Sequence, residues 1–197
     1  MLSSIDLMFK TIAATTFLTA SAACAYPAIT EISNPPVIEI EVVTKSWKCP
    51  GCNENEKYVL AKLQENTKIS DRNALAAIMG NIKSESNFHP NICEGGARVA
   101  YDKCYSGGYG LIQWTSIGRY NNLGKFAAKY GYDPSTLEGQ TAFMINESVF
   151  QRYLPEFEGA GRTVSQYMVP AYYWLGWGIK GYREHYAYDY TKKMVLA

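Results

Sequence analysis

The chain has 197 residues, a length that suits one domain with a real hydrophobic core. Its formal net charge is +1, and no basic run is as dense as a nucleic-acid-binding arm, so we expect no nucleic-acid partner. Only the aromatic content, 14%, stands out from the composition of ordinary globular proteins.

The first 25 residues have the pattern of an export signal. From Met8 the sequence reads MFKTIAATTFLTASAACA, with one lysine, an apolar stretch and then small residues. Residues 23–25 satisfy the small-x-small rule for cleavage before Tyr26, and the stretch is too short and threonine-rich for a typical membrane span. We therefore predict a signal peptide over residues 1–25. A lipoprotein anchor at Cys24 and an uncleaved apolar anchor are the alternatives.

If the protein is exported, its cysteines enter an oxidising compartment. Four remain after cleavage: Cys49, Cys52, Cys93 and Cys104. An even number in an oxidising compartment indicates two disulfides, and local pairing, Cys49–Cys52 and Cys93–Cys104, is the simplest arrangement. A redox CxxC pair is one alternative, but the flanking strand and long helix of that motif are missing. Zinc held by four thiols is another, although the second spacing does not fit, and we expect no metal.

Residues 26–52 read as a tether. Its part from Tyr26 to Lys48 contains three prolines and then a short alternating run, Val37 to Val43, that could form an edge strand. The folded domain is expected over residues 53–197, with a first helix beginning at Asn53. We predict that this tether joins the signal peptide to the domain.

A second helix is predicted after Ser70 or Asp71, either of which suits an N-cap. Its apolar residues recur at steps of three and four, the period of a buried helical stripe. They are Leu75, Ile78, Met79 and Ile82. The helix should run to about Ser86 and must stop before Pro90.

Between Asn91 and Thr115 the helical spacing of apolar residues gives way to frequent glycines. This segment is typical of a β-hairpin or a glycine-hinged loop, with Cys93 and Cys104 placed to pin it. Helices are then expected over Arg119–Tyr130, from Leu137 to about Tyr153, and in an aromatic segment from Val164 onward. The predicted fold is α+β and mainly helical, with one small β-hairpin.

Glu85 lies at the end of the second predicted helix, near its apolar stripe. Partial desolvation there would favour the protonated carboxyl, and a carboxyl protonated near neutral pH suits a general acid for a glycosidic oxygen. The alternative is a solvated acid at a helix end.

Two short motifs add a family resemblance. The stretch GNIKSESNFHP, residues 80–90, followed by GGYGLIQWT, residues 107–115, resembles phage tail lysozymes, relatives of the goose-type lysozyme and lytic transglycosylase superfamily. EGQTAFMINE, residues 138–147, resembles a third family stretch, a helix that packs behind the cleft. The resemblance covers about Glu56 to Tyr190 and implies a lysozyme-like catalytic domain.

The resemblance assigns roles to particular residues. Glu85 matches the catalytic acid and Ser86 its usual neighbour. Gly110, Leu111 and Gln113 match the second motif, whose glutamine faces the bound sugar, and we therefore count Ser86 and Gln113 among the substrate-binding candidates. No cofactor is implied.

Two residues compete for the role of a second catalytic carboxylate. Lysozymes of the T-even phage type carry an aspartate nine residues after the acid and a threonine six further on, whereas this chain has Glu94 and Ala100 there. Glu94 is a candidate water-activating base, and Asp102 is its rival. A carboxyl separation of roughly 6.5–9.5 Å would mean inversion and about 5–5.5 Å retention. The goose-type resemblance implies that one glutamate can suffice.

Aromatic residues supply further candidates. Tyr109 and Trp114 flank the second motif and are predicted to stack on sugar rings, with core packing as the alternative. The C-terminal YYWLGWG and the tyrosines after it suggest another sugar platform. Aromatics at helical spacing are more often core, and core packing is our prediction for that segment.

Together these observations predict a phage-encoded peptidoglycan hydrolase that cleaves the β-1,4 bond between N-acetylmuramic acid and N-acetylglucosamine, in host lysis or wall penetration. Its partners would be glycan strands and the phage virion or lysis machinery, and we expect a monomer. It would be exported to the periplasm or outside the cell, or else be virion-associated. The alternatives are a lytic transglycosylase, a peptidase that pairs Cys93 or Cys104 with a histidine, and a non-catalytic virion or glycan-binding protein.

Overall fold

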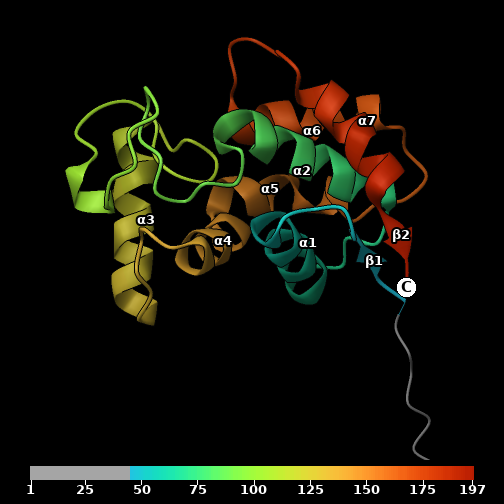
Figure 1. Ribbon diagram of the computed structural model, residues 1–197, viewed down its shortest axis with the longest axis horizontal. Coiled ribbons are helices and arrows are strands. Elements are labelled where there is room, and N and C mark those ends of the chain that lie inside the picture. Colours follow the sequence, from blue (N-terminus) through green and yellow to red (C-terminus); the bar gives the residue numbers. More distant parts are fainter. Residues whose placement is uncertain (1–44) are drawn as a thin grey trace, which may run out of the picture. The chain divides into compact units, whose positions relative to one another are not determined.

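The structure is a computed structural model that describes residues 45–197 (Figure 1). The predicted signal peptide and the predicted strand at Val37–Val43 lie outside the described residues. In chain order the elements are β1 (Trp47–Lys48), α1 (Glu54–Asn66), α2 (Arg72–Ser86), the 3-10 helix η1 (Tyr101–Lys103), α3 (Ile117–Tyr130), α4 (Leu137–Asn146), α5 (Ser148–Phe157), α6 (Val164–Leu175), α7 (Arg183–Lys193) and β2 (Val195–Leu196). The prediction of a mainly helical α+β fold is confirmed.

The predicted starts of the first two helices are confirmed, and their caps explain them. Asn53 caps α1, where its side chain accepts a hydrogen bond from the Glu56 amide and the Glu56 carboxylate accepts one from the Asn53 amide. Asp71, rather than Ser70, caps α2 by accepting from the Asn73 amide at 2.7 Å.

One predicted helix is in fact two. The stretch from Leu137 to Tyr153 divides at Glu147, whose ψ of 133° is extended and separates α4 from α5. The Glu147 side chain is buried and binds Arg119 through both oxygens, at 2.6 and 2.7 Å. The break between α4 and α5 therefore coincides with a long-range ion pair, which the helical periodicity of the sequence does not reveal.

The predicted hairpin is also corrected. Between Asn91 and Thr115 the chain forms only two isolated bridges, Ile92 with Arg98 and Cys93 with Tyr109. Glycines with positive φ interrupt the extended backbone that a regular ladder needs. They are Gly95, Gly96, Gly107 and Gly110. The glycine-hinged loop is therefore the correct alternative for this segment.

The regular sheet joins the two ends of the described chain instead. β1 and β2 are antiparallel, with Trp47 opposite Leu196 and Lys48 opposite Val195. Cys49 and Cys52 are buried nearby, and the Trp47 indole donates to the Ser70 carbonyl at 2.9 Å. Residues 47–52, the end of the predicted tether, thus pack as part of the folded unit.

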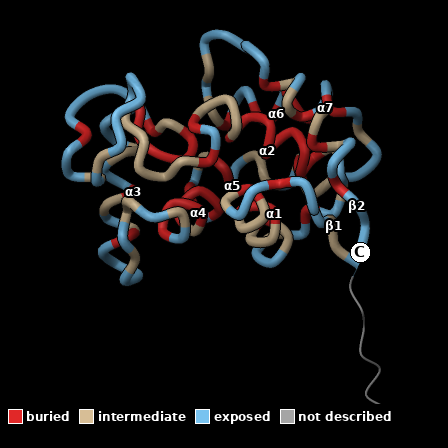
Figure 2. The backbone as a smooth tube through the Cα atoms, in the orientation of Figure 1, coloured by how far each residue is buried: buried red, intermediate tan, exposed pale blue. Residues whose placement is uncertain are grey.

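Helix α2 forms the centre of the core, as Figure 2 shows by its buried colour. Every residue from Ala74 to Ile82 is buried. α7 packs closely along it. The packing is so close that a Cβ at Gly80 would lie 2.5 Å from the Ala187 amide nitrogen. No helix in the described part of the chain is both long and apolar enough to cross a membrane. The predicted acid at the end of α2 is therefore mounted on a helix that is buried from Ala74 to Ile82.

Candidate active site

The chain leaves α2 through a strained turn directly after Glu85 and Ser86. Asn87 and Phe88 have φ values of 50° and 62°, in the left-handed region that bulky side chains rarely adopt. The Phe88 side chain is fully buried, and its carbonyl accepts a hydrogen bond from the Asn55 amide group at 2.9 Å. Such backbone strain concentrates at functional sites, where the surrounding structure holds it in place.

The second motif has the same property. Gln113 has a φ of 52°, so all three non-glycine residues with positive φ in residues 45–197 fall within the two motifs. A buried hydrogen bond joins the motifs, since the Ser86 hydroxyl donates to the Leu111 carbonyl at 2.7 Å. Ser86 is buried and its hydroxyl links the two motifs in this structure, and its role in substrate binding stays a prediction.

Gln140 of α4 supports both motifs from behind. Its side-chain nitrogen donates to the carbonyls of Pro90 and Pro134, at 2.6 and 2.8 Å, and its oxygen accepts from the Leu111 amide at 2.7 Å. A Cβ at Gly110 would clash with this same amide group, which explains the glycine. The third stretch thus forms a helix that bonds to both motifs, and the buried amide within the run GQTAFMI was the available signal for its role.

Glu85 forms an ion pair that sequence reasoning missed. Its side chain is 14% exposed, and Oε1 lies 2.5 Å from Nη2 of Arg183, the first residue of α7. Oε2 accepts no hydrogen bond from the residues described. The two residues are 98 positions apart, so no local motif could have paired them. The pairing orients Glu85 through one oxygen and leaves the other available.

Arg183 is itself held by the loop between α6 and α7, at the top of Figure 1. Nη1 donates to the carbonyls of Ile179 and Lys180, at 2.8 and 3.0 Å. The guanidinium also lies 5.2 Å from the ring centroid of Trp177, a cation–π distance. The ion pair therefore fastens this loop to the end of α2.

The other predicted carboxylates have different surroundings. Glu94 exchanges two hydrogen bonds with Gly108: its carboxylate accepts from the Gly108 amide at 2.9 Å, and its own amide donates to the Gly108 carbonyl at 2.8 Å. Asp102, on η1, is exposed and lies 3.1 Å from Lys103. Neither carboxylate bonds to Glu85, whose one described partner is Arg183. The structure thus places Glu94 against the second motif and Asp102 at the surface.

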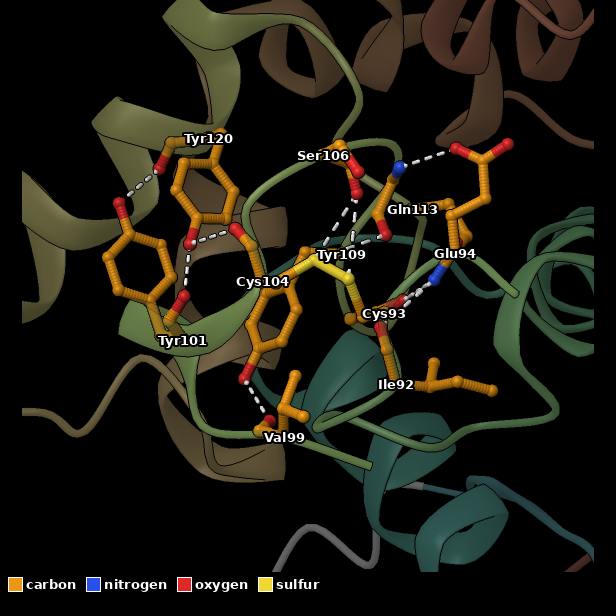
Figure 3. Close-up of a disulfide and its surroundings, with 12 residues drawn as sticks. Ile92, Cys93, Glu94, Val99, Tyr101, Cys104, Ser106, Tyr109, Gln113 and Tyr120 are labelled. Atoms are coloured by element: carbon orange, nitrogen blue, oxygen red, sulfur yellow. Dashed lines mark hydrogen bonds between the residues drawn. A yellow bond between two sulfur atoms is a disulfide. The ribbon is translucent and has the colours of Figure 1, made fainter. Parts of the chain in front are cut away.

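The cysteines pair as predicted. Cys49 and Cys52 form one disulfide, and Cys93 and Cys104 form the other, with Cα atoms 5.6 Å apart. These sulfurs are therefore available neither as a peptidase nucleophile nor as a four-thiol zinc site. Figure 3 shows the second disulfide between Glu94 on one side and Tyr101 and Tyr120 on the other.

The tyrosines beside that disulfide form a packed group. Tyr101 and Tyr120 stack with ring centroids 4.3 Å apart, and Tyr109 meets both edge-on. Burial raises the pKa of Tyr120 to about 12, with Tyr101 contributing to the shift. The group keeps the loop's outer end attached to α3.

The remaining substrate-binding candidates are mostly enclosed. Tyr109 and Trp114 are fully buried, so packing, the alternative to sugar stacking, describes both rings in this structure. The Gln113 side chain is half-buried and donates back to the Gly110 carbonyl at 3.0 Å. Of the four predicted contacts, Gln113 alone retains partial exposure.

A helical domain with a carboxylic acid in the last turn of its central helix, directly before a strained turn, has the features of a lysozyme-like protein. Residues 54–168 match the model of the phage tail lysozyme family, and the chain belongs to that family. Membership indicates a peptidoglycan-degrading enzyme of phage origin. Comparison with curated proteins and with solved structures gave no match. Arg183 and Trp177 lie beyond the matched segment.

Proposed function

We propose that the protein is a glycoside hydrolase that cleaves the β-1,4 bond between N-acetylmuramic acid and N-acetylglucosamine, with Glu85 as general acid. The observation that carries the proposal is the placement of Glu85. Its carboxyl has one oxygen held by Arg183 and one without a partner among the described residues, beside a strained turn joined to the second family motif.

The proposed chemistry uses the two oxygens differently. A proton on Oε2 passes to the glycosidic oxygen, the bond from that oxygen to the anomeric carbon breaks, and the leaving sugar departs as an alcohol. Water then adds to the anomeric carbon and gives its proton to a base, and proton exchange with solvent restores the starting protonation state of both groups. Arg183 acts as a positioning residue, because its bond to Oε1 restricts the rotation of the carboxyl group.

We propose Glu94 as the base that activates water, with Asp102 as its rival. Replacing each acid by its amide separates them: we expect Glu94→Gln and Asp102→Asn to lose less activity than Glu85→Gln, and the larger loss to identify the base. Equal, negligible losses would support a mechanism with a single glutamate. Gln113 remains the proposed sugar contact of the second motif.

A lytic transglycosylase is the second candidate, and the surroundings of the two acids favour it. The Glu94 carboxylate already binds the Gly108 amide, and Asp102 pairs with Lys103. If neither activates water, the C6 hydroxyl of the muramic acid residue can attack its own anomeric carbon and form a 1,6-anhydro ring.

Product analysis tests the proposal. Protein lacking the first 25 residues is incubated with Gram-negative sacculi, with the Glu85→Gln variant as control, and the released material is assayed for reducing ends and free amino groups. New reducing ends would support hydrolysis, and soluble anhydro products without them would indicate the transglycosylase. Free amino groups without reducing ends would refute both and point to cleavage of wall peptides.

We also propose export to the periplasm or the exterior, with a role in host lysis. The signal pattern before Tyr26 and the two disulfides support this, since disulfides persist in oxidising compartments. N-terminal sequencing of the expressed protein should find Tyr26 first. Detection in purified virions with Met1 or Met8 still attached would instead assign the protein to the virion.

A further inference from the structure

Exposed apolar side chains concentrate on α6 and the loop that follows it. Tyr172 and Tyr173 are 47% and 57% exposed, while Trp174, the next residue of α6, is buried in the core. The predicted core role of the YYWLGWG segment is thus correct for Trp174 and wrong for the tyrosines. An exposed aromatic pair on a helix that already has a buried face needs another explanation.

Four rings form a continuous row, which we call the aromatic row: Tyr153, Tyr173, Tyr172 and Trp177. The two central rings are exposed, and the two end rings, Tyr153 and Trp177, are partly buried against the core. Tyr153 stacks on Tyr173 with centroids 5.8 Å apart. Tyr172 meets Tyr173 and Trp177 edge-on, at 5.2 Å in each case. These contacts hold the rings against one another, so they form a surface that is ordered before any ligand binds.

One end of the aromatic row reaches the proposed acid. The Trp177 ring lies against the Arg183 guanidinium, and Arg183 binds Glu85. The row therefore ends one side chain away from the Glu85 carboxyl group. This continuity selects the occupant, because the polymer that a phage tail lysozyme meets is a glycan strand, and the faces of sugar rings are apolar enough to stack on aromatic rings.

We propose that the aromatic row is a binding surface for the glycan strand of peptidoglycan and directs the strand toward Glu85. The assignment to that polymer rests on the proposed function. The row lies mostly outside residues 54–168, so it would be a feature added to the part of the chain that matches the family.

Binding without cleavage tests the proposal. The full-length chain carrying Glu85→Gln is sedimented with purified sacculi, and Tyr172→Ala with Tyr173→Ala is compared with Tyr130→Ala, a 55% exposed tyrosine at the end of α3. We expect the double variant to bind about tenfold more weakly and the control to bind normally. In the active chain, the double variant should raise KM for sacculi and leave kcat and the melting temperature near those of the parent.

Several results would overturn the proposal. They are unchanged sedimentation of the double variant, an equal loss in Tyr130→Ala, and a dimer in sedimentation analysis that the double substitution dissociates while binding to sacculi stays intact. The same experiments distinguish a failure of the proposed function. In that case the active chain would release no reducing ends, while sedimentation with sacculi would still depend on the aromatic row.

Discussion

The segment from Glu85 to Thr115 and the segment from Val169 to Arg183 both meet at the proposed acid, and they are built in opposite ways. The first is fixed by buried hydrogen bonds from Ser86 and Gln140 and by a disulfide. The second exposes its tyrosines, Tyr172, Tyr173 and Tyr182, and connects to the first through the Arg183–Glu85 pair. The difference suggests that one segment holds the chemical groups in place while the other supplies contact area. Such a division can be tested residue by residue.

The largest effect is expected from Glu85→Gln. The amide keeps the size of the side chain and still accepts a hydrogen bond from Arg183, but it cannot donate an acidic proton. Losing general-acid assistance typically costs 10²–10⁴-fold in rate, so we expect at least about a hundredfold loss in clearing of sacculi. The melting temperature should be unchanged or slightly higher. Retention of most activity would refute the lysozyme mechanism.

Removing the disulfide of the first segment should come next. Cys93 and Cys104 are 11 positions apart, and a loop of that size is worth roughly 3 kcal/mol by the chain-entropy estimate. We expect Cys93→Ser with Cys104→Ser, or added reductant, to lower activity before the fold is lost, as monitored by circular dichroism. Cys49→Ser with Cys52→Ser is the control, since that loop holds no predicted catalytic residue. Full activity without the Cys93–Cys104 bond would show that the loop needs no covalent support.

Breaking the link between the segments should have a smaller effect. Arg183→Ala removes a charge-assisted hydrogen bond worth about 2 kcal/mol and frees the Glu85 carboxyl to rotate. We expect kcat to fall about tenfold with KM for sacculi little changed, and Arg183→Lys to restore part of kcat. A matching rise in KM, or equal losses in both variants, would argue against a positioning role.

The smallest effect concerns pH and lies away from both segments. Burial raises the pKa of Glu56, but hydrogen bonds from Tyr190 and the Asn53 amide, together with the charge of Lys83, outweigh it and leave the pKa lowered from 4.5. A lowered folded-state pKa means stability that is present above the unfolded-state value and is lost as pH falls through the folded-state value. Glu56→Gln should therefore show a weaker fall in melting temperature below about pH 4.5. An unchanged acid slope would contradict this assignment.

Much of the architecture could be predicted because its causes are local. Asp71 and Pro90 delimit α2 through capping and backbone sterics, and the spacing of Cys93 and Cys104 permits the observed bond. The glycine-rich segment was harder, since its residues allow both a hairpin and a hinged loop. The structure decided between them, because it shows only two isolated bridges there, Ile92 with Arg98 and Cys93 with Tyr109.

The sequence by itself determined the helical class, the limits of α2 and the position of Glu85 at a helix end, since each follows from neighbours within a few residues. It also favoured the disulfide pairing that the structure shows. Tertiary structure alone decided that Arg183 binds Glu85 and that the Ser86 hydroxyl binds the Leu111 carbonyl. It also decided which aromatic rings of α6 are exposed. These outcomes depend on how distant helices pack, because burial and ion pairing are set by the neighbours a side chain meets in space and not by those beside it in the chain.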